Sequence, residues 1–211
     1  MPSLDPRRQL IREILKALKA TTKSPVIEKG SMQLSVPMLV DTGVARDRGE
    51  FIEVDRPRAL LEYLRAGGTY WEVAHLVTWR DFEQFTSLAL EAFGYSVIRD
   101  YRFKFRGKRH QIDVIGFKPG TVVCFECKML RKRMSSVARA AKLHADRVRK
   151  LCLAKPSWLP SSSRVYPVIV TVLEYREKAV DGVPVVPFYM LNSFLMDIEY
   201  APIPGAVFFT T

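Results

Sequence analysis

The feature that most constrains the fold is a pair of apolar segments, residues 109–117 and 121–128, joined by Pro119-Gly120. Proline fixes φ near about −65° and glycine accepts a positive φ, so this dipeptide suits the two central positions of a tight turn. A hairpin centred there pairs residues whose numbers sum to 239, which places Asp113 opposite Glu126. A longer loop with the same centre keeps this register, whereas a loop with an odd number of residues shifts it by one.

Asp113 and Glu126 form the chemically informative pair of this hairpin. Directly opposed side chains have Cβ atoms about 4.5–5.5 Å apart, and two carboxylates this close among apolar neighbours raise each other's pKa. A cation between them removes that cost, and Mg²⁺ takes oxygen ligands of this kind. Lys128 lies two residues beyond Glu126 and therefore projects from the same face of the strand. Carboxylates that hold Mg²⁺ beside an ammonium group are typical of phosphodiester hydrolysis.

The alternative is a pair of surface strands whose charges face water, with Lys128 bridging Glu126. Apolar residues flank both acids, among them Ile112 and Phe125. This flanking favours internal strands, where a charged pair needs a partner.

The positive charge of the chain is concentrated around the same hairpin. The formal net charge is +11. Residues 99–155 hold 17 Lys and Arg against four acids, a net of +13, so the rest of the chain carries −2. Such a segment predicts an acidic polymer as partner. Adsorption to a membrane would require an amphipathic basic helix with bulky apolar residues, and this segment is mainly strands and a helix of small residues. A solvated basic face is the other alternative; nucleic acid is the interpretation we favour.

The first 68 residues predict a small helix-rich domain. The elements expected in chain order are a helix from Pro6 with Asp5 as its N-cap, a short helix from residue 36, a hairpin turned at Asp47-Arg48-Gly49, and a helix between Asp55 and Gly67. Residues 21–35 are expected to be turn-like. This order of elements is that of a winged-helix domain, which suits DNA binding and equally a dimerisation or docking module.

Residues 69–211 predict an α/β domain. The expected elements are a helix from Thr78, with Asp81 completing a capping box, strands at 95–99, 109–117 and 121–128, a basic helix at 132–153, buried strands at 164–173 and 183–188, and a last helix carrying Phe194, Leu195 and Ile198. The apolar end Val207-Phe208-Phe209 is either an interface or a last strand.

Asp113 followed by Glu126-Cys127-Lys128 on the next strand resembles the motif of the PD-(D/E)XK nuclease superfamily, with Ile112 in the place of the proline. The stretch Trp79-Arg80-Asp81-Phe82-Glu83, in a helix before a strand, resembles the Mrr-type restriction endonuclease-like branch. The strand Gly182-Val183-Pro184-Val185-Val186-Pro187 resembles archaeal-type members with an N-terminal winged helix. The resemblance covers roughly residues 78–175. It implies a restriction-endonuclease-like αβββαβ core with a mixed sheet, dependence on Mg²⁺ (or Mn²⁺), and attack by a metal-activated water on a DNA phosphodiester.

The same resemblance assigns roles to the acids. Asp113 and Glu126 hold the metal, the backbone carbonyl of Cys127 and the carboxylate of Glu83 complete its ligands, and Lys128 positions the water. Glu83 lies on the flank of the apolar stripe of its helix, so an ordinary boundary residue is the alternative for this position.

Basic residues around the hairpin are the candidates for contacts with nucleic acid. Arginine and lysine alternate with phenylalanine between residues 102 and 106, which predicts one basic and one apolar face of a strand. The full set of candidates is Arg102, Lys104, Arg106, Lys108, Arg109, Arg131, Lys132, Arg133, Arg139, Lys142 and Arg147. For the helical members, charge that is simply solvated is the alternative.

Cys124 and Cys127 invite a zinc or redox interpretation. Residues three apart in a strand point to opposite faces, so the two sulfur atoms are expected to diverge. Cys152 is isolated in the predicted helix, and the three histidines share no ligand spacing. We therefore expect no zinc or redox role. His144 is the exception among the histidines and keeps a possible role in the site, because the helix after the Glu-x-Lys strand often lines the active-site cleft in this superfamily.

The leading hypothesis is thus a cytoplasmic metal-dependent deoxyribonuclease. A protein that binds DNA or regulates on a nuclease-like scaffold is the second hypothesis, with the winged helix as its working part. A structure-selective enzyme such as a Holliday-junction resolvase is the third, and it requires a homodimer.

Overall fold

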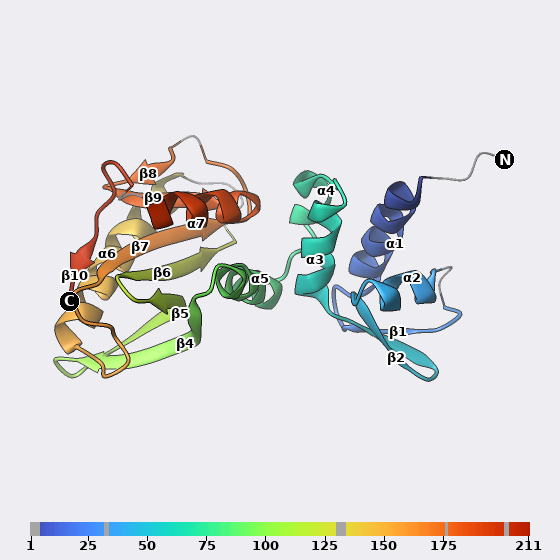
Figure 1. Ribbon diagram of the computed structural model, residues 1–211, viewed down its shortest axis with the longest axis horizontal. Helices are drawn as coiled ribbons and strands as arrows, with labels where there is room; N and C mark the ends of the chain where they lie inside the picture. Colours follow the sequence, from blue (N-terminus) through green and yellow to red (C-terminus); the bar gives the residue numbers. More distant parts are fainter. Residues whose placement is uncertain (1–4, 32–33, 130–133, 176, 201–202) are drawn as a thin grey trace. The chain divides into compact units, whose positions relative to one another are not determined.

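The computed structural model describes residues 5–31, 34–129, 134–175, 177–200 and 203–211. The chain folds as two compact units, Met1–Phe85 and Thr86–Thr211, so the division lies within helix α5 (Trp79–Ala92) (Figure 1). The first compact unit therefore extends beyond residue 68. The predicted domain limits, 1–68 and 69–211, stay a prediction.

The first unit combines short helices with a small sheet. Its elements before α5 are α1 (Pro6–Ala20), β1 (Val26–Glu28), α2 (Val36–Asp41), β2 (Ala45–Arg48), β3 (Phe51–Val54), α3 (Arg56–Arg65) and α4 (Tyr70–Ala74). The strands form an antiparallel sheet in the order β1-β3-β2. The predicted N-caps are confirmed: the carboxylates of Asp5 and Asp55 accept hydrogen bonds from the N–H groups of Arg7 and Arg58.

Two details of this unit differ from the sequence prediction. Strand β1 lies in the stretch 21–35, for which the sequence predicts turns. These residues become a strand because they pair with β3. The hairpin turns through Gly49-Glu50 rather than through Asp47-Arg48-Gly49, because Arg48 pairs with Phe51. Gly49 takes a φ of 80° and its N–H donates to the side chain of Asp47, which stabilises the tighter turn. The winged-helix interpretation of the unit stays a prediction.

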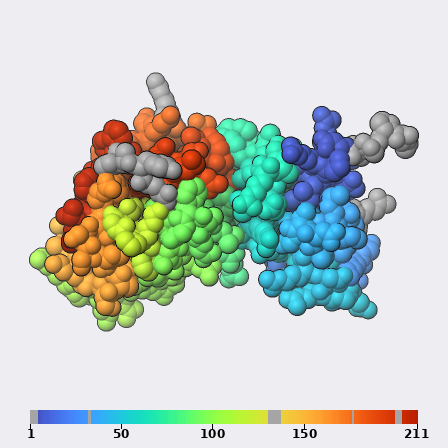
Figure 2. Space-filling model, viewed as in Figure 1, coloured from blue at the N-terminus to red at the C-terminus, as the bar shows by residue number. Residues whose placement is uncertain are grey.

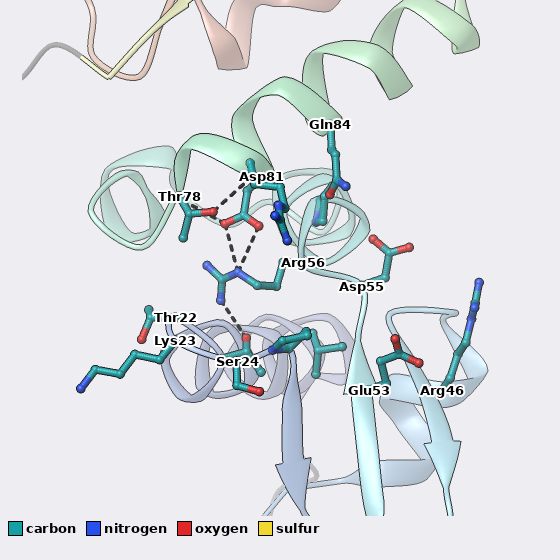
Figure 3. Close-up of a pocket in the computed structure, with 15 residues that line it drawn as sticks. Thr22, Lys23, Ser24, Arg46, Glu53, Asp55, Arg56, Thr78, Asp81 and Gln84 are labelled. Atoms are coloured by element: carbon teal, nitrogen blue, oxygen red, sulfur yellow. Dashed lines mark hydrogen bonds and ion pairs between the residues drawn. The ribbon is translucent and has the colours of Figure 1, made fainter. Parts of the chain in front are cut away.

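A buried arginine ties the helices of the first unit together (Figure 3). Arg56 is 6% exposed and its Nε donates to both carboxylate oxygens of Asp81, at 3.2 and 3.0 Å. Its Nη1 donates to the carbonyl of Leu18 and the hydroxyl of Thr21, and its Nη2 to the carbonyl of Leu76. One guanidinium thus satisfies the end of α1, the start of α5 and the turn before it.

The second unit has the αβββαβ order that the sequence predicts. After α5 come β4 (Ser96–Phe105), β5 (Lys108–Lys118), β6 (Thr121–Lys128), α6 (Met134–Ala154), β7 (Arg164–Thr171), β8 (Ala179–Val180), β9 (Val183–Pro187), the 3-10 helix η1 (Phe188–Met190), α7 (Leu191–Tyr200) and β10 (Phe209–Thr210). The predicted α/β class, with an αβββαβ core and a mixed sheet, is confirmed. At the C-terminus, Phe209 and Thr210 pair with β7, so the last-strand alternative is the one that the fold adopts.

These strands form a mixed seven-stranded sheet, which is covered on two faces. The order is β4-β5-β6-β7-β9-β8, with β10 paired to the start of β7 (Figure 1). Strands β6, β7 and β9 are parallel to one another, whereas the pairs β4–β5, β5–β6, β8–β9 and β7–β10 are antiparallel. On one face, Val148 and Leu151 of α6 pack with Ile115 and Cys124 of the central strands. On the other face, Gly116 leaves room for Leu90 of α5, because a Cβ atom there would lie 2.5 Å from its side chain. None of the helices in the described part of the chain is long and apolar enough to cross a bilayer.

Strand β4 is longer than predicted and includes the alternating basic segment. It runs from Ser96 to Phe105, where residues 95–99 were expected, and turns into β5 through Arg106-Gly107. Both turn residues have positive φ, 48° and 78°, which is the geometry of a two-residue hairpin loop. β6 pairs with β5 from residue 114 onward, so residues 101–112 form a two-stranded ribbon.

Candidate active site

The hairpin of β5 and β6 has the predicted register. Recorded partners run from Lys118 with Thr121 to Val114 with Phe125, and every pair sums to 239. Gly120 has a φ of 81°, as the second central residue of the turn requires. Local turn chemistry therefore positions the two acids on neighbouring strands.

Asp113 lies where this ladder ends. One position beyond Val114, its carboxylate Oδ2 accepts a hydrogen bond of 2.8 Å from the backbone N–H of Cys127. The side chain is 8% exposed. On the β4 side, Asp100 has a φ of 51° and lies between the regular pairs Arg99–Val114 and Tyr101–Ile112. The backbone pairing at Asp113 is therefore irregular toward both β4 and β6. A carboxylate thus replaces part of the backbone ladder and joins β5 to β6.

Glu126 and Lys128 share one face of β6, as strand alternation predicts. The ammonium Nζ of Lys128 lies 2.5 Å from Oε1 of Glu126. Glu126 is only 4% exposed, whereas Lys128 is half-buried. The pair therefore places a cation at the open side of a carboxylate that is otherwise enclosed.

Helix α6 brings Arg147 to the carboxylate of Glu126. The Nη1 of Arg147 bonds to Oε2 of Glu126 and its Nη2 lies 3.4 Å from Oε1, while the contact of Arg147 with nucleic acid stays a prediction. Nη1 also donates to the carbonyl of Gln111 at 3.1 Å. Arg147 lies one residue before Val148 on the sheet-facing side of the helix. A basic residue beside the apolar stripe was the signal that could have revealed this contact.

His144 is fully buried beside the same carboxylate. Its Nε2 lies 2.7 Å from the carbonyl of Cys124, so Nε2 carries the proton and donates it. Its Nδ1 lies 3.8 Å from Oε2 of Glu126 and has no hydrogen-bond partner among the described residues. Burial is the main cause that lowers the pKa of His144 to about 4, so the ring is neutral near pH 7.

The ionisation of Glu126 is set by opposing effects. Burial is the largest single effect and raises the pKa of this carboxyl, but the hydrogen bonds from Arg147 and Lys128 and the nearby positive charge together outweigh it. The pKa therefore lies below its ordinary value, and Glu126 is an anion near pH 7. An anionic carboxylate is the form that can bind a metal ion.

Glu83 lies on the half of α5 that belongs to the first unit. Its carboxylate accepts a hydrogen bond from the indole N–H of Trp79, one helical turn earlier. The capping box predicted at the start of this helix is confirmed by reciprocal bonds between Thr78 and Asp81. The metal role of Glu83 stays a prediction.

The other basic candidates lie mostly on exposed positions. Those on the ribbon and on α6 that are exposed are Arg102, Lys104, Arg106, Lys108, Arg109, Arg139 and Lys142. Arg102 forms an ion pair of 2.9 Å with Asp100. Arg131, Lys132 and Arg133 lie outside the described residues. The alternation predicted for residues 102–106 is confirmed, since Phe103 and Phe105 are half-buried.

The cysteines have the arrangement expected of core residues. All three are free and buried. Cys124 packs under α6, whereas the sulfur of Cys127 lies 3.8 Å from the hydroxyl of Thr86 on α5, so the two point to opposite faces of β6. Burial raises the pKa of Cys124 well above its ordinary value and that of Cys152 to about 11. Buried neutral thiols of this kind are poor nucleophiles and ligands.

The donor chemistry at the hairpin fits a hard divalent cation. Asp113 and Glu126 supply carboxylate oxygens, and the Nδ1 of His144 is a buried acceptor beside Glu126. In the described ranges, no three His, Cys, Asp or Glu side chains form a group that could hold a metal ion by themselves. Two carboxylates match the way Mg²⁺ is usually held, with water and substrate phosphate as its remaining ligands.

The segment that carries this geometry is similar to a known nuclease-related family. Residues 78–172 match the model of the nuclease-related domain, NERD. An uncharacterized protein of Archaeoglobus fulgidus is 28% identical over 125 residues, which are 58% of this chain and 92% of that protein. The matched segment runs from α5 to β7 and includes the hairpin of β5 and β6, so this part of the chain is similar to a nuclease-related domain.

Solved structures with a similar chain trace include those of three proteins. Protein VC1899 from Vibrio cholerae has a TM-score of 0.39 at 12% identity over 92% of this chain and 50% of its own. Can2 from Sulfobacillus thermosulfidooxidans, solved with cyclic tetra-adenylate, has a TM-score of 0.42 at 11% identity over 92% and 52%. The small subunit of the heterodimeric restriction endonuclease R.BspD6I has a TM-score of 0.35 at 14% identity over 62% and 75%. The chain spans about half the length of the first two.

Proposed function

We propose that the second unit hydrolyses phosphodiester bonds of DNA with Mg²⁺ or Mn²⁺, as an endonuclease or exonuclease. The main support is the hairpin of β5 and β6, which carries the two buried carboxylates Asp113 and Glu126 and the ammonium of Lys128. The match of residues 78–172 to the nuclease-related domain covers this hairpin. The net charge of +13 between residues 99 and 155 suits an anionic polymer as substrate.

The residues of the hairpin have distinct roles in this proposal. Asp113 and Glu126 hold the metal ion, with the backbone carbonyl of Cys127 as a further ligand. The ion, when bound, acts as a Lewis acid and lowers the pKa of a bound water. Lys128 orients the attacking water and stabilises the negative charge that develops on the phosphate, because its ammonium lies beside Glu126 on the same face.

A cleavage assay with and without metal tests this function. We expect the purified chain to cut DNA with Mg²⁺ or Mn²⁺ and to lose all cutting when EDTA removes the metal. Linear duplex, single-stranded, flapped and four-way DNA should be compared in the same assay. Binding without cutting under every metal condition would contradict the proposal and favour a regulatory DNA-binding protein. Cutting confined to four-way DNA would favour a dimeric junction resolvase.

Replacing Arg147 should change the affinity for metal. Its guanidinium bonds to the carboxylate of Glu126 and competes with a cation for the same oxygens. We expect Arg147→Met to bind Mn²⁺ about tenfold more tightly, since one partly buried charge opposite a carboxylate contributes roughly 1–2 kcal/mol. Titration of Mn²⁺ followed by electron paramagnetic resonance measures this without any cleavage. Arg149→Met is the matched control, because Arg149 pairs with the exposed side of Asp146 on the same helix. Unchanged or weaker Mn²⁺ binding by Arg147→Met would show that the ion pair does not compete with the metal.

A further inference from the structure

The ribbon formed by residues 101–112 has two chemically different faces. Residues of one face, Tyr101, Phe103 and Ile112, pack against the cluster that includes α6. Tyr101 also meets the ring of Trp158 edge-on, with centroids 5.2 Å apart. The opposite face carries the exposed residues Arg102, Lys104, Arg109 and Gln111. The ribbon is thus anchored through its aromatic side and presents its basic side to solvent.

Like charges face each other directly on the exposed side. Lys104 is the cross-strand partner of Arg109, and Arg102 is the partner of Gln111 one step along. Directly opposed like charges destabilise a strand pair. Between residues 101 and 112 there are five Lys and Arg and no acid. Among the recorded ion pairs of the described residues, the face has one neutralising contact, from Asp100 to Arg102. A polyanion bound to this face would remove the repulsion.

The hairpin of the first unit provides an internal contrast. Strands β2 and β3 also carry basic residues, but Arg48 pairs with Glu53 at 2.8 Å. Asp47 on the same hairpin forms an ion pair with Lys29, with 2.6 Å between Oδ1 and Nζ. Cations that are already paired with neighbouring carboxylates gain little free energy from binding a phosphate. The ribbon, rather than the β2–β3 hairpin, therefore has the charge that phosphate can satisfy.

We propose that the basic face of the β4–β5 ribbon binds duplex nucleic acid and makes duplex DNA the substrate class of the neighbouring hairpin site. This inference rests on the proposed function. A two-stranded β-ribbon fits the major groove of B-form DNA. Proteins that bind single strands use exposed aromatic rings as platforms for unstacked bases. Here the rings of Tyr101 and Phe103 face the protein, and the free face has cations and one amide.

The surface position of the ribbon agrees with this assignment. In Figure 2 the green to yellow-green atoms of β4 and β5 lie at the surface of the second unit. A hollow at the ribbon is lined by Arg102, Lys104, Arg109 and Gln111 of the basic face and by Phe103 and His110 of the other face. An anionic group is complementary to the three cations that border this hollow.

Fluorescence anisotropy with the full chain in EDTA tests the inference without cleavage. A labelled duplex of about 20 base pairs and the single strand of the same length are the probes. We expect the duplex to bind at least about tenfold more tightly. The double variant Lys104→Gln/Arg109→Gln should weaken duplex binding at least about tenfold and reduce the slope of log Kd against log salt by about 2, one unit for each lost phosphate contact.

The matched control is Arg46→Gln/Arg48→Gln on the β2–β3 hairpin. It removes the same charge from exposed strand positions of the first unit. We expect duplex binding to change less than about threefold in this variant. Circular dichroism checks that both double variants fold. If Lys104→Gln/Arg109→Gln does not fold, the single variant Arg109→Gln takes its place.

Several results would overturn the inference. They are equal loss in both double variants, single-strand binding as tight as duplex binding, or binding to anionic lipid vesicles without binding to DNA. If the ribbon variant bound the duplex normally and the chain still cut DNA with metal, the inference would fail and the proposed nuclease function would stand. Cleavage that survives Asp113→Asn would refute the proposed active site and leave the binding result untouched.

Discussion

The Asp113→Asn protein is expected to bind DNA as tightly as the unaltered chain and to cut it at least about a thousandfold more slowly. Asparagine has the same shape and its carbonyl oxygen can accept the hydrogen bond from the N–H of Cys127, so the strand connection is retained. What is lost is the negative charge that holds the cation. Metal ions supply several kcal/mol of transition-state stabilisation, and about 4 kcal/mol corresponds to a thousandfold change in rate.

Lys128→Met should give a similar loss of cutting for a different reason. The methionine keeps the apolar part of the side chain and removes the ammonium beside Glu126. Single-turnover cleavage with Mg²⁺, together with anisotropy in EDTA, separates the chemical step from binding. Asp146→Asn is the control, because this acid pairs with Arg149 and Lys150 on the exposed side of α6. Undiminished cutting by both Asp113→Asn and Lys128→Met would refute the proposed site.

Arg56→Met is expected to lower the free energy of unfolding by about 3–5 kcal/mol, the usual cost of breaking a buried ion pair by removal of one partner. Asp81 is 4% exposed and would be left as a buried charge without its main counterion. The carbonyl of Leu76 and the hydroxyl of Thr21 would lose a donor as well. Urea denaturation followed by circular dichroism measures the effect.

Two further variants identify the cause of that loss. Arg80→Met removes an exposed arginine beside Asp81, and it should change the stability by less than about 0.5 kcal/mol. Adding Asp81→Asn to Arg56→Met should recover part of the loss, because the buried charge is then gone while a capping side chain remains. A double variant that is less stable than Arg56→Met would show that the uncompensated charge is not the source of the effect.

The parts of the structure that follow from neighbouring residues could be predicted. Pro119-Gly120 fixes the register of β5 and β6, and the capping residues Asp5, Asp55 and Thr78 mark the helix starts. These features depend on a few adjacent residues whose backbone preferences agree. The β2–β3 turn was displaced because Arg48 could extend the strand pairing to Phe51 at no cost in side-chain burial.

Contacts between distant segments could not be predicted in the same way. Arg147 lies 21 residues from Glu126, and Arg56 lies 25 residues from Asp81. Sequence patterns identified each as basic or as a capping residue, but the partner depends on how a helix packs on a sheet or on another helix. The orientation of the Asp113 side chain could not be predicted either. The regular alternation of strand faces breaks at this position, where the carboxylate accepts a hydrogen bond from the backbone of β6.

The anchoring of the ribbon has a consequence for the speed of encounter with DNA. Its aromatic side is held by Trp158 and by the cluster under α6, so the positions of Lys104 and Arg109 are set before any partner arrives. A surface that is already ordered loses little conformational entropy on binding. Its charge therefore acts at long range as a fixed field. We expect association to be fast at low ionic strength and to slow steeply as salt screens that field.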